Sequence, residues 1–282
     1  MRARATDLEL LMRPRWHRFL SPHYDDIALS CGGTATLLAE GGHCPEIVVV
    51  FGAESEPGVP LSPYAAAMHR SWGFDATEVN ARRRAEEQAA SMVMGTTFRA
   101  LPFRDAIYRG EAYLSDRDLF DTVSTSDRWL PPSIVSAAGL AEAPDPASRV
   151  YAPLAVGRHV DHQVVFQAAV QLAKTGWEVW FYEDLPYALW NDALPDRLAT
   201  AEVDLARVAS VDITATWGAK IDAILAYRSQ LGAVFSSIGS SGNRDEIDAL
   251  LGTYAAGAED GRREERFWRV LRSDGASRTS PS

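Results

Sequence analysis

Residues 17–53 read HRFLSPHYDDIALSCGGTATLLAEGGHCPEIVVVFGA, and their order of apolar and polar residues predicts a β–α–β unit. The apolar segment 17–21 suits a short strand. Residues 28–42 read as a helix that ends at a glycine pair, because glycine favours the left-handed conformation just past a helix end. Residues 46–53 form a nearly continuous β-branched run, typical of a strand buried on both faces of a parallel sheet. Such a crossover is right-handed.

The rest of the chain continues this alternation. Further strands are expected at 97–103, 148–156 and 177–188, and further helices at 80–95, 160–176, 214–231, 244–257 and 261–271. A long Pro/Gly/Ser-rich loop starts at residue 54 and reaches to about 80, and loops of this length are more often functional than idle. The end of the chain reads as a disordered tail.

This pattern predicts a single α/β domain over residues 1–282. We expect a Rossmann-like, mainly parallel sheet flanked by helices, followed by a mostly helical C-terminal extension that starts near residue 232 and ends in the tail.

Composition restricts the class of partner. The chain is 46% hydrophobic and 23% charged, as in ordinary soluble globular proteins, and its formal net charge is −10. Nucleic acid is not expected as a partner, because its binding usually needs a basic face. The N-terminus lacks a signal-peptide core and the aliphatic run 47–51 is too short to span a membrane, so we expect a cytoplasmic protein without a membrane partner. Cys31 and Cys44 are too few for a disulfide framework.

Two polar motifs follow two of the predicted strands. SPHYDD (21–26) contains His23, Asp25 and Asp26, and GRHVDH (157–162) contains His159 and His162. Because ligands of open parallel sheets bind outside the carboxyl ends of the strands, both motifs are expected at one edge. Two histidines, one carboxylate and an open fourth position form a common catalytic zinc set. The remaining carboxylate and histidine would supply a general base and an acid or oxyanion stabiliser.

Each motif alone also has a structural interpretation. Asp25 or Asp26 suits the N-cap of the following helix, and HVDH suits a solvated helix N-terminus. Both interpretations would have to hold at equivalent strand ends, so the pair favours a metal site. The sequence contains neither the G-x-S-x-G of serine hydrolases nor a P-loop lysine motif.

The pair PHYDD and GRHVDH resembles the paired motifs of the PIG-L/LmbE-like N-acetylglucosamine deacetylases, which are metal-dependent amidases on a Rossmann-like sheet. Supporting matches extend the likeness over roughly residues 17–232: RRAEEQAASMVMG (83–95), LPFRDA (101–106) and KIDAILAYRSQ (220–230). The resemblance implies a hydrolase that removes an N-acyl group, expected to be acetyl, from a small-molecule amino-sugar metabolite.

The resemblance also implies roles at the reacting centre. His23, Asp26 and His162 would bind a divalent metal, with zinc expected and Fe²⁺ compatible with the same ligands. Asp25 would be the general base for the attacking water. His159 would stabilise the oxyanion and protonate the leaving amine, and Asp161 would hold its ring.

For substrate binding, the resemblance implies that Arg83 and Asp105 contact sugar hydroxyls or an aglycone substituent. Some sugar-inositol deacetylases carry a tyrosine that assists the oxyanion two residues before the second-motif histidine. Here that residue is Gly157, and the candidates to replace the tyrosine are Arg158, Tyr182 and Tyr187.

Two other functions fit the same residues: an amidase for a larger amide conjugate, and a catalytically silent sugar- or metal-binding protein. Asp25 argues against the silent protein, because a binder needs no base beside the metal. The sequence leaves open the sugar or aglycone, the acyl length, the metal and whether the protein forms a homo-oligomer.

Overall fold

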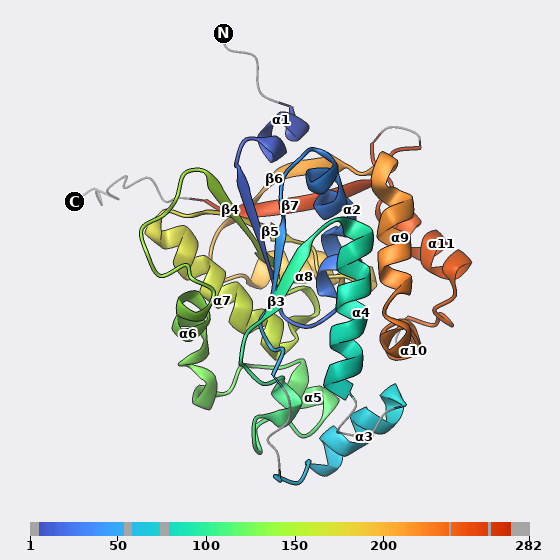
Figure 1. The fold of residues 1–282 in the computed structure, drawn as a ribbon. Helices are drawn as coiled ribbons and strands as arrows, with labels where there is room; N and C mark the ends of the chain where they lie inside the picture. The colour runs from blue at the N-terminus through green and yellow to red at the C-terminus, as the bar shows by residue number, and fades with distance from the viewer. Residues whose placement is uncertain (1–5, 54–57, 74–78, 237, 259–260, 272–282) are drawn as a thin grey trace, which may run out of the picture.

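A seven-stranded sheet with the order β3-β2-β1-β4-β5-β7-β6 forms the centre of the computed structural model (Figure 1). The structure describes residues 6–53, 58–73, 79–236, 238–258 and 261–271. Its strands are β1 (Trp16–Ser21), β2 (Glu46–Val49), β3 (Thr97–Ala100), β4 (Ser148–Pro153), β5 (Glu178–Tyr182), β6 (Leu205–Asp212) and β7 (Glu264–Val270). The first five pair in parallel, and β7 is antiparallel to both β5 and β6.

Helices cover both faces of the sheet. They are α1 (Asp7–Met12), α2 (Asp26–Glu40), α3 (Pro63–Trp72), α4 (Val79–Met94), α5 (Asp116–Leu119), α6 (Leu130–Ala137), α7 (Val160–Thr175), α8 (Ala193–Thr200), α9 (Trp217–Leu225), α10 (Arg228–Ser236) and α11 (Arg244–Tyr254). One layer contains α2, α4 and α9, which contact one another, and α6 packs on α7 on the other side (Figure 1). Among the described residues, no helix is long and apolar enough to cross a membrane.

The central strands are apolar on both faces because both faces are covered. Phe19 of β1 is paired with Ile47 of β2 and with Tyr151 of β4, and all three side chains are fully buried. The expected α/β fold class and the β–α–β unit of residues 17–53 are therefore confirmed.

Some predicted elements were wrong. The helix expected at 261–271 is strand β7, in which Glu265 and Phe267 are buried while their neighbours are partly exposed. This two-residue alternation lies within a charged stretch whose residues favour a helix, so the sequence pattern predicted a helix instead of a strand. The helix expected at 214–231 is divided into α9 and α10, and the long loop after β2 contains α3. The predicted tail, beyond residue 271, lies outside the described residues.

Helix α2 packs closely against Ile213 at Gly33 and is kinked at Cys31. A Cβ at Gly33 would lie 2.7 Å from Ile213, so the helix contacts the residue after β6 through bare backbone. Cys31 departs from helical geometry at φ −144°. The Glu265 carboxylate accepts the N–H groups of Gly33 and Thr34 at 3.1 and 2.7 Å and pairs with the buried Lys220 ammonium at 2.6 Å.

Replacing Glu265 should strongly destabilise this packing. We expect Glu265→Ala to lower the free energy of unfolding by about 3–5 kcal/mol, because it leaves the Lys220 charge buried without its partner. Urea titration followed by circular dichroism measures the change. Glu264→Ala on the same strand, where the side chain is only partly buried, should cost less than about 1 kcal/mol. Equal losses in the two variants would contradict the assigned role.

Candidate metal centre

The two sequence motifs meet where the strand order changes direction. From β1 the chain proceeds to β2 and β3 on one side, and it then returns to place β4 and β5 on the other side of β1. The loops that follow β1 and β4 therefore diverge and leave a crevice at the carboxyl ends of these strands, the usual ligand site of such sheets. His23–Asp26 follow β1, and His159–His162 follow β4.

The turn after β1 separates the two aspartates. Asp25 adopts the left-handed conformation φ 93°, ψ −29°, and its backbone carbonyl accepts the Leu29 N–H at 3.1 Å. Its side chain makes no capping hydrogen bond to the described backbone. The Asp26 carboxylate instead turns back and accepts the His23 N–H at 2.7 Å. Asp25 is thus the N-cap residue through its backbone alone, and its carboxylate remains available in the crevice.

His162 presents its Nε2 to Asp26. Its Nδ1 donates to Asp184 Oδ1 at 2.6 Å, so in the neutral ring Nε2 is the nitrogen that carries the lone pair. Nε2 is buried, has no hydrogen-bond partner among the described residues and lies 3.5 Å from Asp26 Oδ1. Asp184 is itself held by the Val156 N–H at 2.9 Å. Metal-ligating histidines are oriented in this way by a carboxylate on their other nitrogen.

His23 is oriented from the opposite side. Its Nε2 donates to Asp161 Oδ2 at 2.9 Å, and its Nδ1 lies 3.5 Å from Asp26 Oδ2. Asp161 also accepts the Ala106 N–H at 3.0 Å and pairs with the Arg109 guanidinium at 2.6 Å. Although burial opposes ionisation, Arg109 and His23 hold the pKa of the Asp161 carboxyl well below its usual range.

The position of Asp161 differs from the prediction that it holds the His159 ring. Its carboxylate is directed to His23 and Arg109, where two donors are available, and only its backbone N–H reaches His159, donating to Nδ1 at 3.2 Å. His159 is therefore the N-cap of α7. Burial and the neighbouring His23 hold the pKa of the His159 imidazole well below its usual range.

The donor set fits a divalent cation. Ligand atoms about 2.1 Å from a tetrahedral ion lie about 3.4 Å apart. The two Asp26 oxygens lie at this spacing from one histidine nitrogen each, Oδ2 3.5 Å from His23 Nδ1 and Oδ1 3.5 Å from His162 Nε2. The unpartnered Nε2 of His162 supports the same reading. His159 also has a nitrogen within 4.8 Å of the other two histidines, and a second group combines His23 with Asp105 and Asp161. In that second group the His23 nitrogen is already bonded to Asp161.

Asp25 lies beside this donor set without belonging to it. Burial and the Asp26 carboxylate raise the pKa of Asp25 to about 8, although Arg83 and His23 oppose the change. The side chain lines the same cavity as His159. A carboxylate with a raised pKa next to a metal-compatible group has the properties of a general base.

A cavity of about 380 Å³ opens onto these residues. Its polar part includes Arg83 and Asp105, which approach each other to 4.0 Å. These are the two residues for which the resemblance implies substrate contacts. Its apolar lining consists of Leu29, Met68, Trp72, Ile107, Leu119, Phe120, Pro186, Tyr187, Trp190, Ala233 and Val234. The cavity therefore combines charged and aromatic lining residues.

Two predicted substrate residues lie elsewhere. Tyr182 is fully buried in β5 and donates to the Leu20 carbonyl at 3.0 Å, because its side chain packs inside the sheet layer. Arg158 is exposed at φ 65° and is not among the described residues that line the cavity. Of the three candidates to replace the missing tyrosine, only Tyr187 lines it, with its ring centroid 5.4 Å from that of His162.

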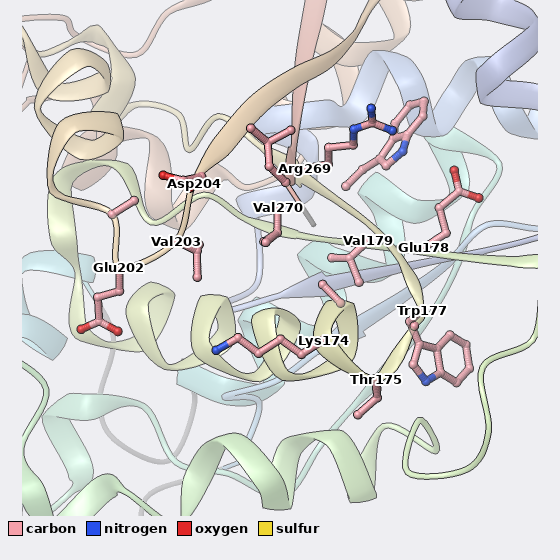
Figure 2. Close-up of a pocket in the computed structure, with 15 residues that line it drawn as sticks. Lys174, Thr175, Trp177, Glu178, Val179, Glu202, Val203, Asp204, Arg269 and Val270 are labelled. Atoms are coloured by element: carbon pink, nitrogen blue, oxygen red, sulfur yellow. The ribbon is translucent and has the colours of Figure 1, made fainter. Parts of the chain in front are cut away.

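A larger hollow of about 1260 Å³ lies at the opposite edge of the sheet (Figure 2). It is lined by the end of α7, the starts of β5 and β6 and the end of β7, with Lys174, Glu178 and Arg269 among its polar side chains. It contains none of the motif residues, so the candidate chemistry lies in the smaller cavity.

Sequence reasoning missed the residues that orient the histidines. Asp184 follows β5 at the same edge of the sheet, so the strand-end argument applied to WFYEDLP would have found it. Arg109 lies in none of the motifs, and no pattern in the sequence indicates its role. It becomes visible only through its contact with Asp161.

Comparison with known proteins finds a family model and relatives that are named as deacetylases. Residues 18–173 match the family described as PIG-L: GlcNAc-PI de-N-acetylase. The 2'-N-acetylparomamine deacetylase of Niallia circulans is 29% identical over 282 residues, 90% of this chain and 94% of the relative. The Streptomyces fradiae enzyme of the same name is 33% identical over 236 residues, 80% of this chain and 78% of the relative. The zinc-inhibited form of teicoplanin deacetylase has 25% identity and a TM-score of 0.71, with 93% of this chain and 100% of that chain covered.

The orienting role of Asp184 is testable by metal affinity. We expect Asp184→Asn to weaken zinc binding by about 10–100-fold, because His162 loses its charged partner. Competition with a chromogenic chelator measures the dissociation constant, with circular dichroism as a check on folding. Glu183→Gln is the matched control, since Glu183 bonds Tyr254, Arg266 and Trp268 instead. An unchanged affinity in Asp184→Asn would refute the assignment.

Proposed function

Because the chain belongs to the PIG-L family of de-N-acetylases, we propose that it is a zinc-dependent hydrolase that removes an N-acetyl group from an amino-sugar-containing small molecule. One observation carries the proposal. The Asp25 and Asp26 carboxylates line one cavity, and the buried Nε2 of His162 lies behind it, 3.5 Å from Asp26 Oδ1.

The cation would be held by His23, Asp26 and His162. When bound, such an ion supplies a Lewis acid for the amide carbonyl and lowers the pKa of a water ligand. Zinc fits the two nitrogens and one carboxylate, and Fe²⁺ suits the same set.

Asp25 takes the proton of the attacking water. Its raised pKa, about 8, lies near neutral pH, and a general base is most effective when its pKa is close to the pH at which it operates. The positive charge of Arg83 acts against this rise in the pKa of Asp25, and it therefore favours the carboxylate form that accepts the proton.

His159 acts on the other side of the amide. Its Nδ1 accepts the Asp161 N–H, so its proton is on Nε2. This N–H can donate a hydrogen bond to the oxyanion of the tetrahedral intermediate. The proton that the leaving amine needs is the one that Asp25 has taken from the water, so the proton count closes on Asp25. Phe120 packs edge-on against the ring, with the centroids 5.3 Å apart, and fixes its orientation. Loss of one oxyanion donor typically lowers the rate about 10²–10³-fold.

The cavity suggests the kind of conjugate. Arg83 and Asp105 suit sugar hydroxyls, while Phe120, Tyr187 and Trp190 form an aromatic wall beside them. The relatives are named for 2'-N-acetylparomamine and for teicoplanin. We therefore place the substrate among amino-sugar conjugates of natural products. The aromatic wall favours, as a second candidate, amide cleavage on a larger apolar conjugate.

A substrate panel tests the proposed function. We expect amine release from N-acetylated amino sugars and their glycosides, abolished by a chelator and restored by Zn²⁺ or Fe²⁺, because the donor set then regains its ion. A fluorogenic amine assay measures turnover, and elemental analysis measures bound metal. Bound metal with no release from any acetylated or longer-acyl substrate would favour the silent binding protein.

The role of Asp25 has its own test. We expect Asp25→Asn to lower kcat by about 10²–10⁴-fold, because the side-chain amide of asparagine cannot accept the proton of the attacking water. The bound metal should remain, since Asp25 lies outside the predicted ligand set. Asp245→Asn, a substitution of an exposed aspartate on α11, is the matched control and should retain turnover. Full turnover in Asp25→Asn would exclude it as the base.

A further inference from the structure

A buried glutamate contacts the strained backbone of Asp25. Glu87 on α4 is only 1% exposed. Its Oε2 accepts the Asp25 backbone N–H at 3.4 Å and the Tyr227 hydroxyl at 2.8 Å. Tyr227 is itself buried and lies in the break between α9 and α10. Glu87 thus links the turn after β1 to the C-terminal helices.

The conformation of Asp25 requires outside support. A residue other than glycine at φ 93° and ψ −29° is strained by about 1–3 kcal/mol and persists only where its surroundings hold it. A relaxed backbone at this residue would redirect the carboxylate, because the side chain turns with φ. Glu87 holds the N–H at one end of that dihedral.

The free-energy cost of burying Glu87 also indicates that this residue has a role beyond packing. Its Oε1 is buried and has no hydrogen-bond partner within the part of the chain that the structure describes. Such an orphan atom costs about 1–3 kcal/mol, and in a native protein it calls for an explanation. Burial also raises the pKa of the Glu87 carboxyl to about 7.

Docking of the helices does not explain the contact. The neighbouring Glu86 already ties α4 to the start of α10, since it accepts the Ser229 N–H at 2.9 Å and the Ser229 hydroxyl at 2.5 Å. The two adjacent glutamates therefore make parallel contacts to the same helical segment, and only the Glu87 contact continues to Asp25.

We propose that Glu87 and Tyr227 are positioning residues that hold the left-handed backbone of Asp25 and so direct its carboxylate at the water. The inference rests on the proposed function, in which Asp25 is the base. Glu87 is not among the described residues that line the cavity, and its hydrogen bonds to described residues go to the Asp25 N–H and the Tyr227 hydroxyl, so it acts through Asp25.

Three variants and one control test this role. Tyr227→Phe keeps the ring and removes the donor to Glu87, and Glu87→Ala removes the acceptor. Glu87→Gln retains a carbonyl that can accept the Asp25 N–H. Ser229→Ala removes the hydroxyl half of the parallel Glu86 contact, keeps its backbone half and is the matched control. For each we would measure kcat, KM, zinc content, melting temperature and amide hydrogen exchange of the peptide 21–29.

We expect kcat to fall about 10-fold in Tyr227→Phe and about 10²-fold in Glu87→Ala, as for a misplaced catalytic group, with KM and zinc content unchanged. Exchange at residues 21–29 should accelerate in both. Glu87→Gln should stay within about threefold of the native kcat. Ser229→Ala should lower the melting temperature without changing kcat or that exchange.

The outcomes separate the two hypotheses. Equal kcat losses in Ser229→Ala and Tyr227→Phe, or unchanged exchange in Glu87→Ala, would overturn the positioning role. Accelerated exchange in Glu87→Ala supports it even if the native protein released no amine. In that case the backbone role would stand and the proposed deacetylation would fail.

Discussion

Burial of several charges around one point is the constraint on which this structure depends. Asp25, Asp26, Asp161 and Asp184 are all less than a tenth exposed at the carboxyl ends of the strands. A buried carboxylate is tolerated only where N–H groups or cations surround it. Three of the four are satisfied by backbone N–H groups, histidines or Arg109, and the surrounding turns are shaped to supply these partners. Asp25 is the exception, and it is the carboxylate that the proposed chemistry needs.

The same constraint links distant segments of the chain. Arg109 connects the loop after β3 to α7 through Asp161, and Asp184 ties the end of β5 to His162. Glu265 of β7 reaches the kinked backbone of α2, immediately beyond the turn that holds the aspartates. The C-terminal strand therefore stabilises the helix that begins at Asp26. Polar contacts across the sheet, as much as apolar packing, hold the site together.

Sequence patterns predicted the elements whose period matched a buried strand or an amphipathic helix. The β–α–β unit, α4 and α7 were within a few residues of their observed bounds, and the strand-end argument brought both histidine motifs to one crevice. Strand β7 was wrongly predicted as a helix, because its alternating buried and partly exposed residues lie within a charged stretch whose composition favours a helix. The prediction for Asp161 was wrong because the resemblance assigned its carboxylate to His159, whereas the carboxylate binds His23 and Arg109, and no local pattern indicates Arg109.

Gly157 shows how a local departure from a family pattern is resolved in three dimensions. It adopts φ +77°, and a Cβ there would lie 2.6 Å from the Cβ of Tyr187. A side chain at 157 and the observed position of Tyr187 therefore exclude each other. Tyr187 occupies that space from the loop after β5, against His162 and Trp190, and lines the cavity. Gly157 thus leaves the space that the aromatic ring of Tyr187 occupies. The cavity therefore has a tyrosine beside its histidines, although the motif itself contains none.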